Sequence, residues 1–290
     1  MLESIDALVA LENFGTVSEA ATRLRLTQSA VSKRLQSLQE EVGFQLMEPD
    51  GRRLRLTAQA IEFLARVRPL VAELRGLMQK KRAAAGDSPL SFSLALADSI
   101  ASSWGPAVIR KSLDALSHCS VDLHAHRSIL VIESVRLGRY DIGLCTESAT
   151  ARDLVQHPLV DEPLVLVHAG LAPRLVRSAP LVTIEPTSAT WRAIQPQLAA
   201  RHSGLLASPL VPVESFGAVV QMARAGFGNG LVPLGLALDL GLDRGGYRPL
   251  RGVTRRIALI TRKTVHELPG FVALRTQLAA AVKTHLAWQR

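Results

Sequence analysis

The sequence predicts two modules of different classes, an all-α module at the N-terminus and a larger α/β module behind it. At 290 residues the chain exceeds the size at which a single core usually stops growing. Apolar residues recur at helical spacing over the first 42 residues, whereas short apolar strands alternate with helices beyond residue 89. A composition of 48% hydrophobic and 20% charged residues is typical of a globular protein. We therefore expect both modules to fold.

Basic residues are concentrated in one part of the chain. The formal net charge is +9, yet residues 1–22 carry four acids and no Lys or Arg. Residues 23–82 carry 13 basic and 6 acidic side chains. This distribution favours a polyanionic partner for the segment that begins at residue 23.

Several classes of protein are disfavoured. No run of about 18 consecutive apolar residues is present, and the N-terminus is acidic rather than a basic signal peptide, so we expect a cytoplasmic protein with no membrane partner. Cys119 and Cys145 are interpreted as structural thiols, with a redox-sensing pair as the alternative. His124 and His126 lack a third ligand at suitable spacing. We therefore expect no metal site and no cofactor.

Three helices are expected in the first 42 residues. The 3.6-residue period of apolar side chains predicts a helix over residues 2–13. Ser18 is the expected cap of a short second helix over residues 19–24. Thr27 is the expected cap of a longer third helix, whose core-facing stripe is Val31, Leu35, Leu38 and Val42. The second and third helices together are typical of a helix-turn-helix.

The opposite face of the third helix suits contact with DNA. Amide, hydroxyl and cationic groups of this kind can bond base edges and phosphates in a major groove. A solvated helix face is the alternative, since polar outer faces are general on surface helices. The candidate DNA-binding residues on this helix are Thr27, Gln28, Ser29, Ser32, Lys33, Arg34 and Gln36.

A basic hairpin and a long helix are expected next. The turn Pro49-Asp50-Gly51 precedes alternating basic and apolar residues, which predicts a wing whose Arg52 and Arg53 contact phosphates. Thr57 can cap a long helix that pairs two copies of the chain, and Pro69 should kink this helix or weaken one of its turns. Packing of this helix on its own module is the alternative. The candidate dimerisation residues are Ile61, Leu64, Val71, Leu74 and Met78.

Beyond residue 89 the alternation predicts a mostly parallel sheet. Helices are expected near 106–116, 129–137 and 269–288, and a further helix opens at Ser188. Strands are expected near residues 92–96, 121–125, 141–145, 164–167, 181–184, 210–213, 230–232 and 256–261.

Together these motifs resemble the LysR-type transcriptional regulators. The resemblance rests on residues 14–21, 26–32, 38–43 and 51–57, and more loosely on 137–144 and 225–233. Ser29 and residues 47–50 depart from the family pattern. The resemblance implies a winged helix-turn-helix over 1–57, a linker helix and hinge over 58–89, and an effector-binding domain over 90–290.

The resemblance further implies that the effector domain has two lobes, similar to periplasmic solute-binding proteins. Lobe I would take residues 90–163 and 266–290, and lobe II residues 164–265. It also implies a homodimer or homotetramer that binds double-stranded DNA, with RNA polymerase as a further candidate partner.

Candidate effector-binding residues follow the expected strands. Ligands of such sheets bind beyond the strand C-termini, where helix N-termini offer amides. By resemblance, Ser99, Ser128 and Thr190 line the cleft; we add Ser102, Arg127, Thr146 and Phe216. We expect a small anion with Arg127 as its charge partner. Asp98 opposes a strongly anionic ligand unless it pairs with Arg127. The alternative is that these hydroxyls only cap helices.

The function expected from the sequence is effector-controlled, sequence-specific DNA binding by a transcriptional regulator. Two alternatives stay open: a sequence-indifferent, nucleoid-type DNA binder, and an α/β enzyme. No ordered nucleophile, base and orienting acid can be named, so we assign no catalytic residue.

Overall fold

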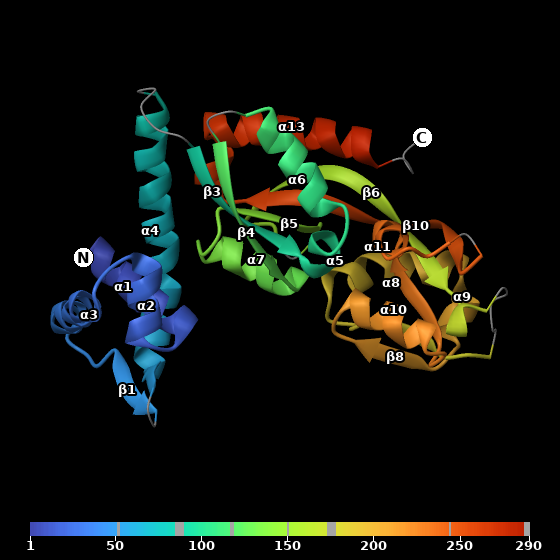
Figure 1. Ribbon diagram of the computed structural model, residues 1–290, viewed down its shortest axis with the longest axis horizontal. Helices are drawn as coiled ribbons and strands as arrows, with labels where there is room; N and C mark the ends of the chain where they lie inside the picture. Colours follow the sequence, from blue (N-terminus) through green and yellow to red (C-terminus); the bar gives the residue numbers. More distant parts are fainter. Residues whose placement is uncertain are drawn as a thin grey trace. The chain divides into compact units, whose positions relative to one another are not determined.

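The computed structural model describes residues 1–50, 53–84, 90–116, 119–149, 151–172, 178–243 and 245–286. The chain divides into two compact units, Met1–Arg75 and Gly76–Arg290 (Figure 1). In the described part of the chain, no helix combines the length and apolar character needed to cross a membrane.

The N-terminal unit contains helices α1 (Leu2–Phe14), α2 (Val17–Leu24) and α3 (Gln28–Val42), the hairpin β1 (Met47–Asp50) and β2 (Arg53–Leu56), and the first part of α4 (Ala58–Ala84). The α3 stripe packs as expected, because Val31, Leu35 and Leu38 are at most 1% exposed. Ala20 and Ala21 of α2 are buried beside them. The helix-turn-helix and its wing are therefore confirmed.

Threonine hydroxyls cap three helices of this unit. The Thr16 hydroxyl accepts a hydrogen bond from the Glu19 amide at the start of α2. Thr27 accepts from the Ala30 amide, and Thr57 from the Ala60 amide, as expected. The cap expected at Ser18 is wrong, because the chain turns helical two residues earlier and Ser18 lies inside α2.

Helix α4 divides the stripe expected to pair two copies of the chain. Leu64 and Val71 are 1% and 8% exposed and pack in the core of their own unit. They are not available to a second copy, which corrects the expectation for these two residues. Ile61 and Leu74 are 52% and 43% exposed, so pairing through them stays a prediction. The side chain of Met78 lies outside the described residues.

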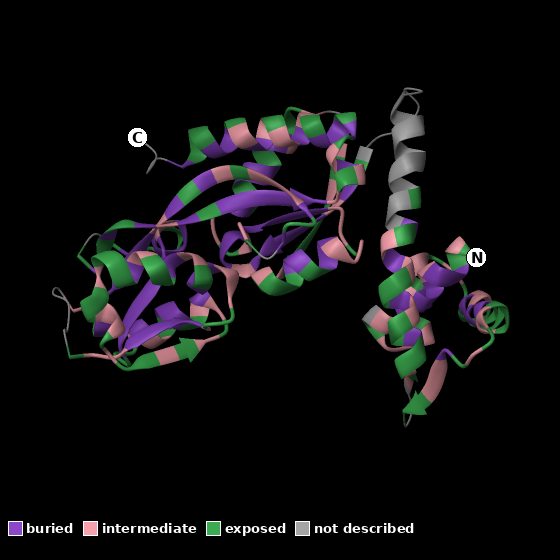
Figure 2. Ribbon diagram, turned by 180° about the vertical axis from the view of Figure 1, so that it is seen from behind, coloured by how far each residue is buried: buried purple, intermediate pink, exposed green. Residues whose placement is uncertain are grey.

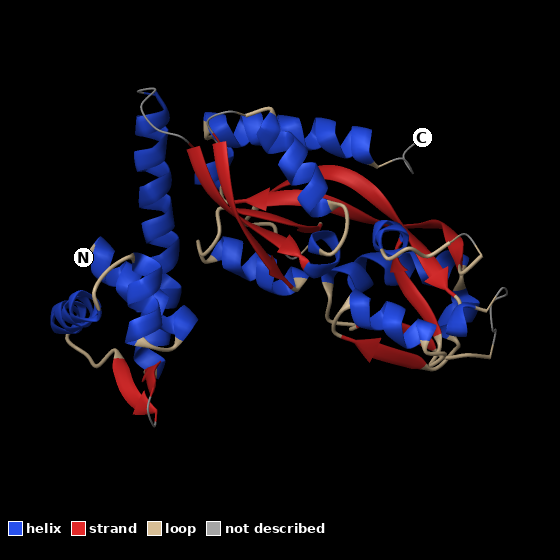
Figure 3. Cartoon of the chain, viewed as in Figure 1, coloured by secondary structure: helices blue, strands red, loops and turns tan. Residues whose placement is uncertain are grey.

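The strands of the C-terminal unit are drawn in red in Figure 3. They form one sheet with the order β4-β3-β5-β10-β6-β9-β7-β8. The sheet is mixed rather than mostly parallel, because β6 and β10 run antiparallel to each other and to their outer neighbours β9 and β5. The strands are β3 (Leu90–Ala97), β4 (Cys119–His126), β5 (Ile142–Thr146), β6 (Val155–Val167), β7 (Leu181–Ile184), β8 (Leu210–Val213), β9 (Asn229–Pro233) and β10 (Tyr247–Thr261).

The sheet extends through two lobes, each with its own core, and helices cover both lobes (Figure 2). Those of the first lobe are α5 (Asp98–Ala101), α6 (Gly105–Asp114), α7 (Ser128–Arg136), α12 (Lys263–His266) and α13 (Pro269–His285). Those of the second are α8 (Ala189–Arg201), α9 (Ser203–Leu206), α10 (Phe216–Arg224) and α11 (Leu234–Asp239), with a short 3-10 turn at Ala169–Leu171.

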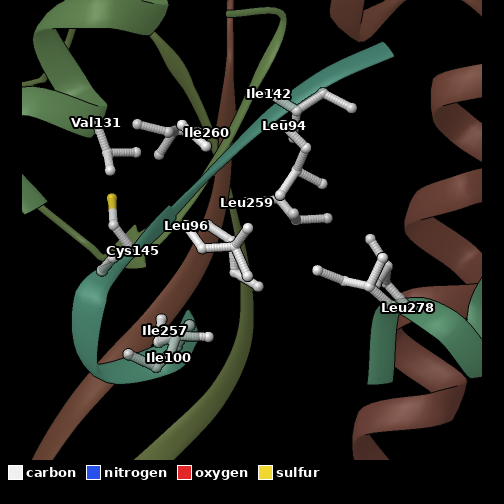
Figure 4. Packing of buried hydrophobic residues seen from close by; sticks show 14 of the residues in the cluster. Leu94, Leu96, Ile100, Val131, Ile142, Cys145, Ile257, Leu259, Ile260 and Leu278 are labelled. Atoms are coloured by element: carbon white, nitrogen blue, oxygen red, sulfur yellow. The ribbon is translucent and has the colours of Figure 1, made fainter. Parts of the chain in front are cut away.

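The long strands β6 and β10 run through both lobes. Ile257, Leu259 and Ile260 of β10 pack in the first core (Figure 4), whereas Val253 packs in the second. The assignment of residues 164–265 to lobe II is therefore wrong at its C-terminal end, because β10 is one continuous strand that crosses between the lobes.

Candidate nucleic-acid interface and ligand pocket

The polar face of α3 is exposed over most of the predicted DNA-binding residues. Thr27, Gln28, Ser29, Ser32, Lys33 and Gln36 are all exposed. Three of these side chains are fixed: Thr27 and Ser29 share a hydrogen bond of 3.0 Å, and the Gln28 amide donates to the Ser18 hydroxyl at 3.0 Å. The face is therefore a partly preorganised row of donors and acceptors.

Arg34 differs from its neighbours on α3. It is half-buried and forms an ion pair of 2.6 Å with Glu3 of α1. Its role in this conformation is to tie two helices of the unit together. We therefore separate Arg34 from the exposed reading face.

The wing is an antiparallel hairpin in which Asp50 pairs with Arg53. Arg55 forms an ion pair of 2.8 Å with Glu48 across the two strands. Arg52 lies outside the described residues, and so does the side chain of Arg53. Their contact with phosphates stays a prediction.

The candidate effector pocket lies in the C-terminal unit, between the ends of strands from both lobes. Its cavity volume is about 90 Å³, within about 580 Å³ of space that includes open solvent. The first lobe contributes the ends of β3 and β4 with the starts of α5 and α7, and the second lobe contributes the ends of β7 and β8 with the starts of α8 and α10. The lining residues are Ala97, Asp98, Ser99, Arg127, Ser128, Ile129, Ile184, Glu185, Thr187, Ser188, Thr190, Glu214, Ser215 and Phe216.

Five of the seven predicted effector-binding residues line this pocket: Ser99, Arg127, Ser128, Thr190 and Phe216. The other two do not. The Ser102 hydroxyl donates to the Asp98 carbonyl within one helical turn. Thr146 is fully buried and shares a hydrogen bond of 2.8 Å with Thr190 from behind the pocket wall.

Carboxylates outnumber cations in the pocket lining. The charged residues are Asp98, Glu185, Glu214 and Arg127. Arg127, which precedes α7 in the first lobe, forms ion pairs of 2.9 Å with Glu214 and 3.4 Å with Glu185 of the second lobe. An anionic ligand would have to compete with both glutamates for the guanidinium. The charge balance therefore does not support the expectation of a simple anion.

A buried ion pair lies beneath the pocket. Arg255 of β10 and Glu162 of β6 are 1% and 0% exposed, and two guanidinium nitrogens donate to the same Glu162 oxygen at 2.8 and 2.6 Å. The other Glu162 oxygen accepts from the Trp104 indole at 3.1 Å. Burial of both charges is tolerated because each is paired and hydrogen-bonded.

The same guanidinium reaches the pocket wall. Arg255 Nη1 donates to the Ser99 hydroxyl at 2.9 Å and lies 3.5 Å from that of Thr190. The guanidinium also stacks over the Phe216 ring, with its carbon 5.4 Å from the ring centroid. Sequence analysis missed this network. Its only signal is that Arg255 falls between Val253 and Ile257 on the inward face of a strand, where a cation requires a buried partner.

The two cysteines are far apart in the first lobe. They lie beside opposite ends of β3. Cys119 pairs with Leu90 at its start. Cys145 follows Leu144, which pairs with Leu96 near its end. At about 3.3 Å per residue, roughly 20 Å separates them along the strands. The redox-pair alternative is excluded in this conformation, because a disulfide needs a Cα separation below about 7 Å.

Two histidine clusters lie elsewhere in the first lobe. His126 shares a hydrogen bond of 2.7 Å with Tyr140, and its pKa is lowered by burial and by the nearby His124. His157 shares one of 2.9 Å with His266, and its pKa is lowered by burial and by Arg275. Within the described ranges, no group of three or more His, Cys, Asp and Glu is placed to hold a metal.

Comparison with known proteins supports the assignment of both units. Residues 2–61 match the bacterial regulatory helix-turn-helix proteins of the lysR family, and residues 87–283 match the LysR substrate binding domain. An uncharacterized HTH-type transcriptional regulator of Vibrio cholerae is 26% identical over 97% of this chain and 96% of its own length.

Solved structures show the same fold. A full-length OxyR variant from Pseudomonas aeruginosa aligns with a TM-score of 0.67 at 17% identity, over 98% of this chain and 94% of its own. CbnR in complex with its target DNA aligns with a TM-score of 0.63 at 19% identity, over 99% of this chain and 100% of its own. Because the two family matches cover residues 2–61 and 87–283, the chain belongs to the LysR family of DNA-binding transcriptional regulators.

Proposed function

We propose that this regulator binds a specific duplex sequence through α3 and the wing, and that a small molecule in the pocket between the lobes modulates this binding. The observation that carries the proposal is the exposed, acid-free N-terminal half of α3, where Ser32 and Lys33 lie beside the fixed amide of Gln28. A helix of this kind fits a major groove, with phosphates held by basic side chains.

The active form in this proposal is a homodimer or homotetramer. Two reading helices spaced by one helical turn bind a palindromic site more tightly than one. Effector binding closes the lobes and changes the spacing of the reading helices, and RNA polymerase is the expected partner at the promoter. The proposal assigns no enzymatic role to the chain.

The test is fluorescence anisotropy of the purified full chain on its own upstream intergenic duplex and on a scrambled duplex of equal length. We expect a preference of about 10³-fold or more for the native duplex at physiological salt. Equal, steeply salt-dependent binding to both duplexes would support the nucleoid-type alternative instead. Absence of binding to either duplex would refute the DNA-binding role.

A pair of variants assigns this binding to α3. Lys33→Ala is expected to weaken binding and to reduce the slope of log K against log salt by about 1, which is the loss of one phosphate contact. The matched control is Lys111→Ala, because Lys111 lies on α6 of the other unit. An unchanged slope for Lys33→Ala would remove Lys33 from the interface.

A further inference from the structure

The two sides of the ligand pocket carry different chemistry. The first lobe presents one charge of each sign, Asp98 and Arg127, whereas the second lobe presents Glu185 and Glu214. The glutamates hold a guanidinium already, that of Arg127 from the opposite lobe, at 3.4 and 2.9 Å. The second lobe therefore contains a cation site that the protein fills with its own side chain.

The first lobe presents hydrogen-bond donors. Ser99 is 4% exposed, and its oxygen accepts from Arg255 at 2.9 Å, which leaves the hydroxyl proton to donate into the pocket. Helix α7 begins at Ser128 without a side-chain cap, whereas α8 and α10 are capped by Ser188 and Ser215. Uncapped first-turn amides favour an anionic group. The first lobe therefore suits a carboxylate.

Ion-pair balance decides which ligand fits both sides. A dianion that takes Arg127 leaves Glu185 and Glu214 without their cation, and a dication that takes the glutamates leaves Arg127 without an anion. A ligand with one group of each sign exchanges partners instead. Its carboxylate pairs with Arg127 and the Ser99 proton, while its cationic group replaces Arg127 at the glutamates. Arg127, Glu185 and Glu214 then each keep a counterion.

We propose that the effector is a zwitterion of the amino acid class, with its carboxylate on the first lobe and its ammonium or guanidinium group on the second. This assignment rests on the proposed function, since it names the ligand of the same pocket. It makes Glu185 and Glu214 specificity-determining residues.

The test is isothermal titration calorimetry of the full chain with the twenty common amino acids. For each one that binds, it is repeated with the α-keto acid and the amine of the same side chain. For an amino acid with an uncharged side chain, the keto acid lacks the cation and the amine lacks the carboxylate. Norleucine and citrulline replace the keto acids of lysine and arginine, which keep a cation. We expect at least one amino acid to bind, and both of its analogues to bind at least about tenfold more weakly. Tighter binding of a keto acid, or failure of every amino acid to bind, overturns the proposal.

Two variants locate the two ends of the ligand, and a third is the control. Glu185→Gln and Ser99→Ala are each expected to weaken binding of the amino acid at least about fivefold. Only Glu185→Gln is expected to reduce the discrimination against the keto acid. The control is Asp114→Asn, which removes one carboxylate from α6 outside the pocket lining. Equal discrimination in Glu185→Gln and the wild type would overturn the assignment of the cationic end.

Anisotropy on the native and scrambled duplexes separates this proposal from the proposed function. If the native duplex is preferred but no zwitterion binds, the ligand class is wrong and the DNA-binding role stands. If neither duplex is preferred, the proposed function fails whatever the calorimetry shows.

Discussion

Replacement of Arg255 by methionine is expected to be among the most destabilising single changes in the C-terminal unit. Glu162 is fully buried, and among the described residues its side chain keeps only the Trp104 indole as a hydrogen-bond partner in Arg255→Met. Removal of one member of a buried ion pair typically lowers the free energy of unfolding by about 3–5 kcal/mol, because the other charge stays buried without compensation. The loss of the Ser99 hydrogen bond adds to this cost.

The assay is urea unfolding of the full chain followed by tryptophan fluorescence. All three tryptophans lie beyond residue 75, so this signal reports the C-terminal unit alone. The unfolding midpoint is compared rather than the amplitude, since Trp104 itself contacts Glu162.

Two controls sharpen the test of the buried pair. Arg256→Met removes the neighbouring arginine, whose ion pair with Asp161 is about half exposed on both sides; a change of at most about 1 kcal/mol is expected. The double variant Arg255→Met/Glu162→Leu should recover most of the loss, because an apolar pair of similar volume has no charge to bury. The reasoning is refuted if Arg255→Met costs no more than Arg256→Met, or if the double variant is no more stable than Arg255→Met.

Three further predictions follow from the local structure. Thr16→Ala is expected to lower the free energy of unfolding of the N-terminal unit by about 1 kcal/mol, and Ser18→Ala by clearly less, in thermal unfolding followed by circular dichroism; equal losses would contradict the cap at Thr16. Because the pKa of His157 is lowered in the folded state, its contribution to stability is complete above about pH 6.5 and is lost as the pH falls below that value. The melting temperature should therefore drop between pH 7.5 and pH 5.5, and the drop should be smaller in His157→Phe. An equal drop in the variant and the wild type would contradict this assignment. Burial raises the pKa of Cys145 to about 12, so a thiol reagent at pH 8 should leave it unlabelled in the native protein and label it in urea; rapid native labelling located at Cys145 by peptide mapping would show that the buried site opens.

The elements best predicted from the sequence are those that one local residue pattern is sufficient to identify. The α3 stripe and the hairpin at Pro49 are local signals, and the structure has both. The sequence pattern predicts strand β6 only from Leu164, whereas the strand begins at Val155. Pro158, Asp161 and Glu162 hide the strand pattern, and the ladder with β10 accommodates Pro158 by a register shift between Ile257 and Ala258.

The candidate pocket was only partly predictable because its parts are remote in sequence. The rule that ligands bind beyond strand ends predicts Arg127, and the family resemblance predicts Ser99 and Thr190; all three line the pocket. The same rule gives no sign of which strand ends face one another. Glu185 and Glu214 are therefore not predicted as pocket residues. The ion pairs between the lobes show that both glutamates are partners of Arg127.

The position of Arg255 connects the contents of the pocket with the strands that join the lobes. Its guanidinium contacts the Ser99 hydroxyl of the first lobe and lies 3.5 Å from the Thr190 hydroxyl of the second. Arg255 itself lies on β10 and its partner Glu162 on β6, the two strands that run through both lobes. Thr146 and Thr190 add a direct hydrogen bond between the lobes at 2.8 Å. The lobes are thus joined at a point directly beneath the candidate pocket, and a ligand that bonded Ser99 would act on the same network. Coupling between sites is typically about 1–3 kcal/mol, which is within the range of one or two such hydrogen bonds. Arg255→Met should therefore reduce the effect of a bound effector on DNA affinity even where it leaves α3 unchanged.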